Sequence, residues 1–159
     1  MRGTAPCPCS SGRSYADCCR PFHAGAAPPS VEALMRSRYS AFALGAVDYL
    51  VETTHPSHPD AGAPREDLVA SLRRVTSSCR YPGLVVLDAR SEGDEGQVLF
   101  RARVFQKGKD LSFTELSDFA RDDGKWKYVA GQPVDGAWQG LTIAAVPGAG
   151  ALRSLASRG

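Results

Sequence analysis

Hydrophobic positions at helical spacing begin soon after residue 30. Leu34, Met35 and Phe42 recur at the intervals of one helix face. Ser30 suits the start of this helix, because its hydroxyl can accept a hydrogen bond from a free backbone N–H. Gly45 suits its end, because glycine readily adopts the left-handed conformation that stops a helix. The pattern therefore predicts a helix between Ser30 and Gly45.

Two shorter apolar patterns predict two more helices. The first ends before Pro56, and its apolar residues are Val47, Leu50 and Val51. The second starts at Pro64, which is favourable at a first helical position, and its stripe consists of Leu68, Leu72 and Val75.

From Tyr81 onward the apolar period changes from helical spacing to two. Strands are predicted over 84–89, 98–105, 113–121 and 126–129, with turn residues between them. In the third strand, Phe113 and Phe119 mark the side that faces the core. Helices followed by an antiparallel meander predict an α+β fold.

Composition divides the chain into three parts. Residues 1–24 are rich in cysteine, proline and serine, residues 25–135 carry the periodic patterns, and residues 136–159 form a tail rich in glycine and alanine. The 159 residues carry a net charge of only +2, so nucleic acid is not an expected partner. The chain has no long apolar run and no apolar segment near its start, which predicts no membrane span and a cytoplasmic location.

Four of the five cysteines lie close together near the start of the chain, at Cys7, Cys9, Cys18 and Cys19. Thiolates are the ligands that zinc prefers, and four of them complete a tetrahedron. Disulfides or free thiols are the alternatives, but adjacent cysteines make a strained disulfide. His23 is a less favoured substitute ligand. The cluster predicts a zinc-binding knuckle with a structural ion.

The string Cys-Pro-Cys-x-Ser-Gly-x-x-Tyr-x-x-Cys-Cys, which begins at Cys7, resembles the SEC-C motif. The resemblance implies that the same four cysteines ligate zinc. It departs from the motif at Ser10, where glycine is usual, and we expect this change to alter the loop without removing a ligand.

Longer segments resemble the YchJ family: Leu34-Met-Arg-Ser-Arg-Tyr-Ser-Ala-Phe42, Gly83-Leu-x-Val-Leu-Asp88 and Asp123-Gly-Lys-Trp-Lys-Tyr128. This resemblance implies an SEC-C knuckle joined to a cone-shaped domain similar to nuclear transport factor 2, with helices packed on a curved antiparallel sheet. Such domains often pair through their sheets, so a homodimer is a further expectation. The family brings no established activity.

A second group of polar residues falls on faces that should be buried. Glu115 and Ser117 share the strand face of Phe119, and Arg38 lies on the apolar stripe of the first helix. A buried carboxylate needs a partner, which predicts an ion pair between Glu115 and Arg38. The other expected pocket residues are Tyr39, beside this pair, and His55, at the pocket mouth.

Two interpretations of this group stay open. Glu115 or His55 could act as an acid or base in a small-molecule site. The favoured alternative is a buried pair that only fixes the packing, and no motif predicts a reaction.

The two sites predict two alternative functions. In the first, the knuckle binds a protein partner through its basic and aromatic residues, Arg13, Tyr15, Arg20 and Phe22. In the second, the cone domain binds a small molecule around Glu115 and Arg38. An open polar pocket would favour the second, whereas a filled cone with an exposed apolar patch on the knuckle would favour the first.

Overall fold

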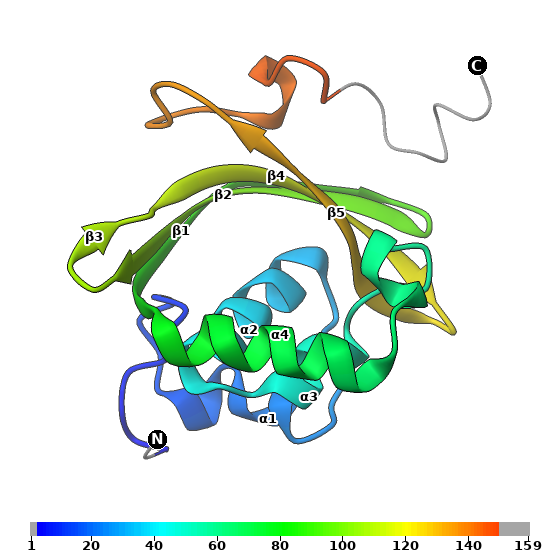
Figure 1. Ribbon diagram of the computed structural model, residues 1–159. Coiled ribbons are helices and arrows are strands. Elements are labelled where there is room, and N and C mark those ends of the chain that lie inside the picture. Colours follow the sequence, from blue (N-terminus) through cyan, green and yellow to red (C-terminus); the bar gives the residue numbers. More distant parts are fainter. Residues whose placement is uncertain (1–2, 150–159) are drawn as a thin grey trace.

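A curved antiparallel sheet covers a layer of helices (Figure 1). The computed structural model describes residues 3–149. The α-helices are α1 (Arg20–His23), α2 (Val31–Leu44), α3 (Val47–Glu52) and α4 (Arg65–Ser78). The short 3-10 helices are η1 (Tyr15–Asp17), η2 (Pro59–Gly62) and η3 (Ile143–Ala145).

The strands are β1 (Arg80–Glu92), β2 (Glu95–Gln106), β3 (Lys109–Asp110), β4 (Phe113–Asp122) and β5 (Lys125–Val134). They pair in the order β1-β2-β4-β5, all antiparallel, and β3 pairs with β2. The predicted α+β class, with helices packed on the concave face of a curved sheet, is confirmed.

Helix α2 begins and ends where the sequence predicts. The Ser30 hydroxyl accepts a hydrogen bond from the backbone N–H of Ala33 at 3.1 Å. Gly45 ends the helix in the left-handed conformation, with a φ of 72°. Between these caps α2 is buried on several sides, because it lies between the cysteine-rich segment and the sheet.

Helix α4 is held less tightly than its predicted stripe suggests. None of its residues is fully buried, and Val75 is 42% exposed. Leu72 packs against the cluster formed by α2 and α3, whereas Val75 lies beside an opening between α4 and the sheet. One end of the stripe therefore borders a cavity and not the core.

The cysteine-rich segment shares one apolar core with the cone. All four clustered cysteines belong to the same buried group as Leu34 of α2 and Phe100 of β2. The composition boundary at residue 24 therefore does not correspond to a gap in the packing.

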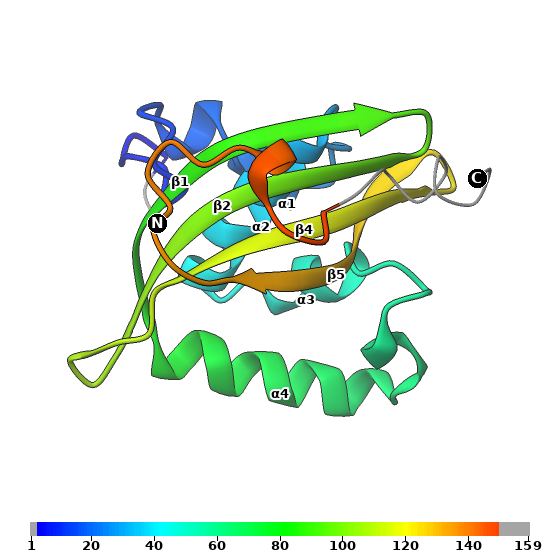
Figure 2. The same ribbon diagram turned by 90° about the horizontal axis from the view of Figure 1, so that it is seen from above.

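The segment after β5 returns over the outer face of the sheet (Figure 2). Ile143 is 1% exposed and packs in one cluster with Leu99 and Leu116, which point away from the helices. The backbone N–H of Ile143 also donates to the Asp88 carboxylate at 2.8 Å. Residues of the expected tail therefore cover this face of the sheet at Leu99 and Leu116.

This covered face bears on the expected homodimer. A homodimer formed over Leu99 and Leu116 would have to displace residues 136–149. The rest of the predicted tail, 150–159, lies outside the described residues. Within the described part of the chain, no helix combines the length and apolar character that a membrane span requires.

Candidate functional site

The four clustered cysteines meet in one buried site. Their sulfur atoms all lie within 4.8 Å of one another, and none forms a disulfide. The sulfur atoms of Cys9 and Cys18 are 3.5 Å apart, and those of Cys18 and Cys19 are 3.9 Å apart. Four thiolates around zinc, each about 2.3 Å from the ion, lie about 3.8 Å apart. The site therefore fits a tetrahedrally coordinated metal ion.

The electrostatics of the cluster also suit a cation. Contacts with Cys7 and Cys9, and then burial, raise the pKa of the Cys19 thiol. Contacts with Cys19 and Cys9 lower the pKa of Cys7. The thiols thus oppose simultaneous ionisation, and a divalent cation would remove that conflict by neutralising their charge.

Two serine hydroxyls contact the sulfur atoms from outside the cluster. Ser11 lies 3.1 Å from the Cys18 sulfur. Ser40, fully buried on α2, lies 3.3 Å from the sulfurs of both Cys7 and Cys19. Such hydroxyls can donate to thiolates and hold their orientation. The cluster is thereby fixed to α2.

Ser10 adopts the conformation that favours glycine, with a φ of 65°. Its hydroxyl accepts a hydrogen bond from the backbone N–H of Leu84 in β1 at 3.1 Å. The departure from the motif therefore places a serine at a φ that is unfavourable for it, removes no ligand, and adds a link between knuckle and sheet.

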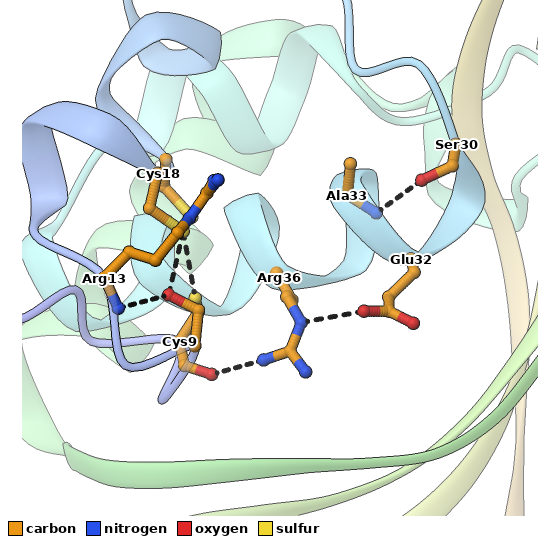
Figure 3. A network of polar contacts seen from close by, with 9 residues as sticks. Cys9, Arg13, Cys18, Ser30, Glu32, Ala33 and Arg36 are labelled. Carbon is orange, nitrogen blue, oxygen red and sulfur yellow. Dashed lines mark hydrogen bonds and ion pairs between the residues drawn. The ribbon is translucent and has the colours of Figure 1, made fainter.

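Arg36 forms a second link (Figure 3). Its guanidinium donates to the Cys9 carbonyl at 2.9 Å and to the Glu32 carboxylate at 3.1 Å. Arg36, Arg13 and Arg90 lie along a groove of about 740 Å³ beside the knuckle.

The aromatic residues of the knuckle are turned inward. The Tyr15 hydroxyl lies 2.7 Å from Nδ1 of His23, and Phe22 packs against the cluster of Leu50. Nε2 of His23 donates to the Ser37 carbonyl at 2.8 Å, so both ring nitrogens have partners and His23 is not placed as a metal ligand. Of the four residues expected to bind a partner, only Arg13 adds exposed charge to the groove, because Arg20 is exposed but does not line it.

The second site is a cavity of about 390 Å³ between α2, α4 and the concave face of the sheet. Its mouth is apolar, because three of the most exposed large hydrophobic residues line it: Val75, Leu111 and Phe113. Phe113 is 41% exposed, so it lies on the expected face of the strand but at the edge of the core. Four of the five expected pocket residues also line this cavity: Arg38, Tyr39, Glu115 and Ser117.

Glu115 is the acidic group of the cavity. Its Oε2 accepts hydrogen bonds from the hydroxyls of Ser117 at 2.5 Å and Tyr128 at 3.4 Å. Burial raises the pKa of the Glu115 carboxyl, and these two hydrogen bonds and the charge of Arg38 oppose the rise. The carboxylate thus loses contact with water, and its hydrogen bonds and the charge of Arg38 offset part of that cost.

The predicted ion pair between Arg38 and Glu115 is wrong in its geometry. Within residues 3–149, the salt bridges, all 4.0 Å or shorter, include none between these two side chains. Arg38 instead donates to the Leu50 carbonyl at 3.0 Å and the Thr53 hydroxyl at 2.6 Å. The carbonyl groups at the end of α3 lack partners within the helix and attract a cation.

Arg38 still reaches the cavity, with its guanidinium carbon 4.8 Å from the centre of the Tyr128 ring. Burial lowers its pKa to about 10, so it stays charged at neutral pH. Its charge therefore acts on Glu115 through space.

Tyr39 and His55 differ in their placement. The Tyr39 hydroxyl accepts from the backbone N–H of Gly83 at 2.8 Å, so it ties α2 to β1 while its ring lines the cavity. His55 does not line the cavity, and its expected position at the mouth is wrong. Its Nδ1 accepts from the backbone N–H of Ser57 at 3.0 Å within its own turn.

Comparisons with known proteins agree with this architecture. Residues 4–21 match the SEC-C motif, and residues 30–131 match the family described as YchJ, middle NTF2-like domain. A UPF0225 protein of Deinococcus radiodurans is 44% identical over 128 residues, which cover 78% of this chain and 86% of that protein.

This chain belongs to the YchJ family. Two solved SEC-C motif containing proteins share its fold. The one from Rhodopseudomonas palustris has 38% identity and a TM-score of 0.69, covering 81% of this chain and 98% of that one. The one from Psychrobacter arcticus has 25% identity and a TM-score of 0.69, with 87% and 89% covered.

Sequence reasoning misses two residues of the cavity. Tyr128 lies in the predicted last strand and is not among the expected pocket residues, yet its hydroxyl contacts Glu115. Gly131 was not considered, and any Cβ there would overlap the Glu115 carboxylate. The signal for Tyr128 was its inward position in the last strand, shared with Trp126.

The titration of Glu115 gives a testable consequence. The pKa of this carboxyl is raised above its ordinary value of 4.5 in the folded protein, so above that value the folded state binds more protons than the unfolded state. Stability from this group therefore falls as pH rises. We expect the free energy of unfolding of wild type, relative to Glu115→Gln, to decrease as pH rises above the ordinary pKa of 4.5.

Urea unfolding at several pH values measures this difference. Glu66→Gln, an exchange at an exposed position of α4, is the matched control and should follow wild type at every pH. A free energy of unfolding of wild type that increases with pH relative to that of Glu115→Gln would contradict the assignment.

Proposed function

We propose that this chain is a ligand-binding protein whose cone cavity takes a small, largely apolar molecule, and whose cysteine knuckle holds a structural zinc ion. The observation that carries the proposal is the cavity of about 390 Å³ with apolar walls and a buried carboxylate. Ligand sites typically have this volume and a few placed polar groups among apolar ones.

The distribution of exposed apolar residues supports the same choice. Among residues 3–149, three of the four exposed large hydrophobic residues line the cavity, namely Val75, Leu111 and Phe113. The fourth, Val85, lies in β1, so none belongs to the knuckle. An apolar mouth suits an apolar ligand.

Zinc suits the knuckle because four thiolates satisfy its tetrahedral preference and leave no position for a substrate. Its role would be to hold the knuckle, and through Ser40 and Ser10 the adjoining faces of α2 and β1. A reducing compartment such as the cytoplasm would keep these thiols available for the ion.

The metal site can be tested by replacing one ligand. We expect Cys9→Ser protein, purified without chelator, to lose its zinc and at least about 3 kcal/mol of unfolding free energy, because binding and folding are coupled. Elemental analysis and urea unfolding measure the two effects. Cys79→Ser is the control and should keep one zinc per chain, and equal metal content in both variants would contradict the site.

The cavity can be tested by filling it. Ala102 is 2% exposed and lines the cavity from β2. We expect wild type to bind the apolar probe 2-methoxynaphthalene and Ala102→Leu to bind it at least about tenfold more weakly, because each tenfold corresponds to only about 1.4 kcal/mol of lost contact. Ala89→Leu, at an exposed position of the same sheet, is the matched control.

Titration calorimetry, with chemical shifts of the cavity residues, reports both affinity and place of binding. Unchanged affinity in Ala102→Leu, or shifts confined to another face, would contradict the proposal.

A protein partner at the knuckle is a second candidate function. The groove has three arginines, Arg13, Arg36 and Arg90, against the one carboxylate of Glu32, and this excess of positive charge favours an acidic segment of such a partner. We expect cross-linking in cells to capture a defined partner with wild type and to lose it with Arg13→Glu, while Arg73→Glu on α4 keeps it. Equal capture by all three proteins would contradict this function.

A further inference from the structure

The carboxylate of Glu115 has one oxygen with partners and one without. Oε2 accepts from Ser117 and Tyr128, whereas among the hydrogen bonds of residues 3–149 none ends on Oε1. Because two hydroxyls donate to this group, it is an acceptor in the folded protein. A ligand in the cavity would meet a carboxylate with capacity for one more donor.

The sheet is built to seat this carboxylate. Gly131 of β5 lies opposite Ser117 of β4, and its missing side chain leaves the space that the Glu115 carboxylate fills. Gly131 is not among the glycines with positive φ, so its backbone does not require glycine. Glycine is required here only because the Glu115 carboxylate occupies the space of a side chain. The sheet thus holds this hydrogen-bond acceptor in a defined position.

The charges around Glu115 limit the head group of a ligand. Arg38 is 7% exposed and charged, and Glu115 balances it. A ligand anion would face the carboxylate, and a ligand cation would upset the balance beside a buried guanidinium. An uncharged donor, such as a hydroxyl, satisfies Oε1 without either penalty.

The walls limit the body of the ligand. Six aromatic rings line the cavity: Tyr39, Phe42, Tyr81, Phe100, Phe113 and Tyr128. Several already pair edge to face, as Phe100 and Phe113 do with centres 6.1 Å apart. Aromatic rings favour another ring in this arrangement beyond simple burial.

We infer that the ligand is an uncharged aromatic alcohol of the phenol or naphthol type, whose hydroxyl donates to Oε1 of Glu115 and whose rings pack among these aromatic side chains. This inference rests on the proposed cavity function and adds the class of ligand to it.

A matched pair of probes tests the head group. 2-Naphthol and 2-methoxynaphthalene share the same rings, but only the naphthol can donate a hydrogen bond. We expect wild type to bind 2-naphthol at least about tenfold more tightly, the range of a hydrogen bond to a charged acceptor. The cationic probe 2-naphthylmethylammonium should bind at least about tenfold more weakly than the naphthol, because it would have to lose its hydration in a site where the charges of Arg38 and Glu115 already balance.

Substitution of the acceptor tests the residue. In Glu115→Met the preference for the naphthol should disappear, while the affinity for the ether stays within about threefold of wild type because the volume of the side chain is kept. Glu66→Gln should keep the preference. If Glu115→Met fails to fold, Gly131→Ala displaces the same carboxylate and should also reduce the preference.

The outcomes separate the two proposals. Binding of the ether and the naphthol with equal affinity would overturn the ligand class and leave the cavity function standing. Tighter binding of the ammonium probe would overturn the uncharged head group. If neither naphthalene binds to wild type, the cavity function fails and the ligand class fails with it.

Discussion

The packing of α2 between the cysteine cluster and the concave sheet is the constraint on which both sites depend. One side of the helix brings Ser40 to the cysteine sulfurs, and another brings Tyr39 and Arg38 to the cavity. Since these residues are consecutive or nearly so, neither site can shift along the helix without moving the other. The caps at Ser30 and Gly45 fix where this helix begins and ends.

The two sites handle buried polar groups in different ways. In the knuckle, four thiols that cannot all ionise together form a site that a cation would complete. In the cavity, the Glu115 carboxylate and the Arg38 guanidinium do not form an ion pair, and each forms its hydrogen bonds with neutral groups. The first arrangement favours permanent occupation by an ion, whereas the second leaves hydrogen-bonding capacity for an exchangeable molecule.

Local rules were enough to predict much of this fold. Capping residues, the change of apolar period at Tyr81 and the cysteine spacing depend on neighbours in sequence, and the structure agrees with them. The failures depend on tertiary detail. A bulge between Asp118 and Phe119 shifts the register of β4 and β5 by one residue. Gly131 and not Ala130 therefore lies opposite Ser117, and counting residues from the turn between the two strands would not predict this pairing. Arg38 donates to the Leu50 carbonyl at the end of α3, which also accepts from the Thr54 hydroxyl, and it forms no ion pair with Glu115. The strand pattern does not contain this competing contact.

The segment that carries Ile143 turns the sheet into the middle layer of a three-layer structure. With helices on one side and this segment on the other, the sheet has little freedom to flatten or bend. Helix α4 has no fully buried residue, whereas the other walls of the cavity, α2 and the sheet, have several. For the ligand exchange proposed above, we therefore expect α4 to be the wall that moves, on the microsecond to millisecond scale of collective helix shifts, while the sheet keeps the binding geometry constant.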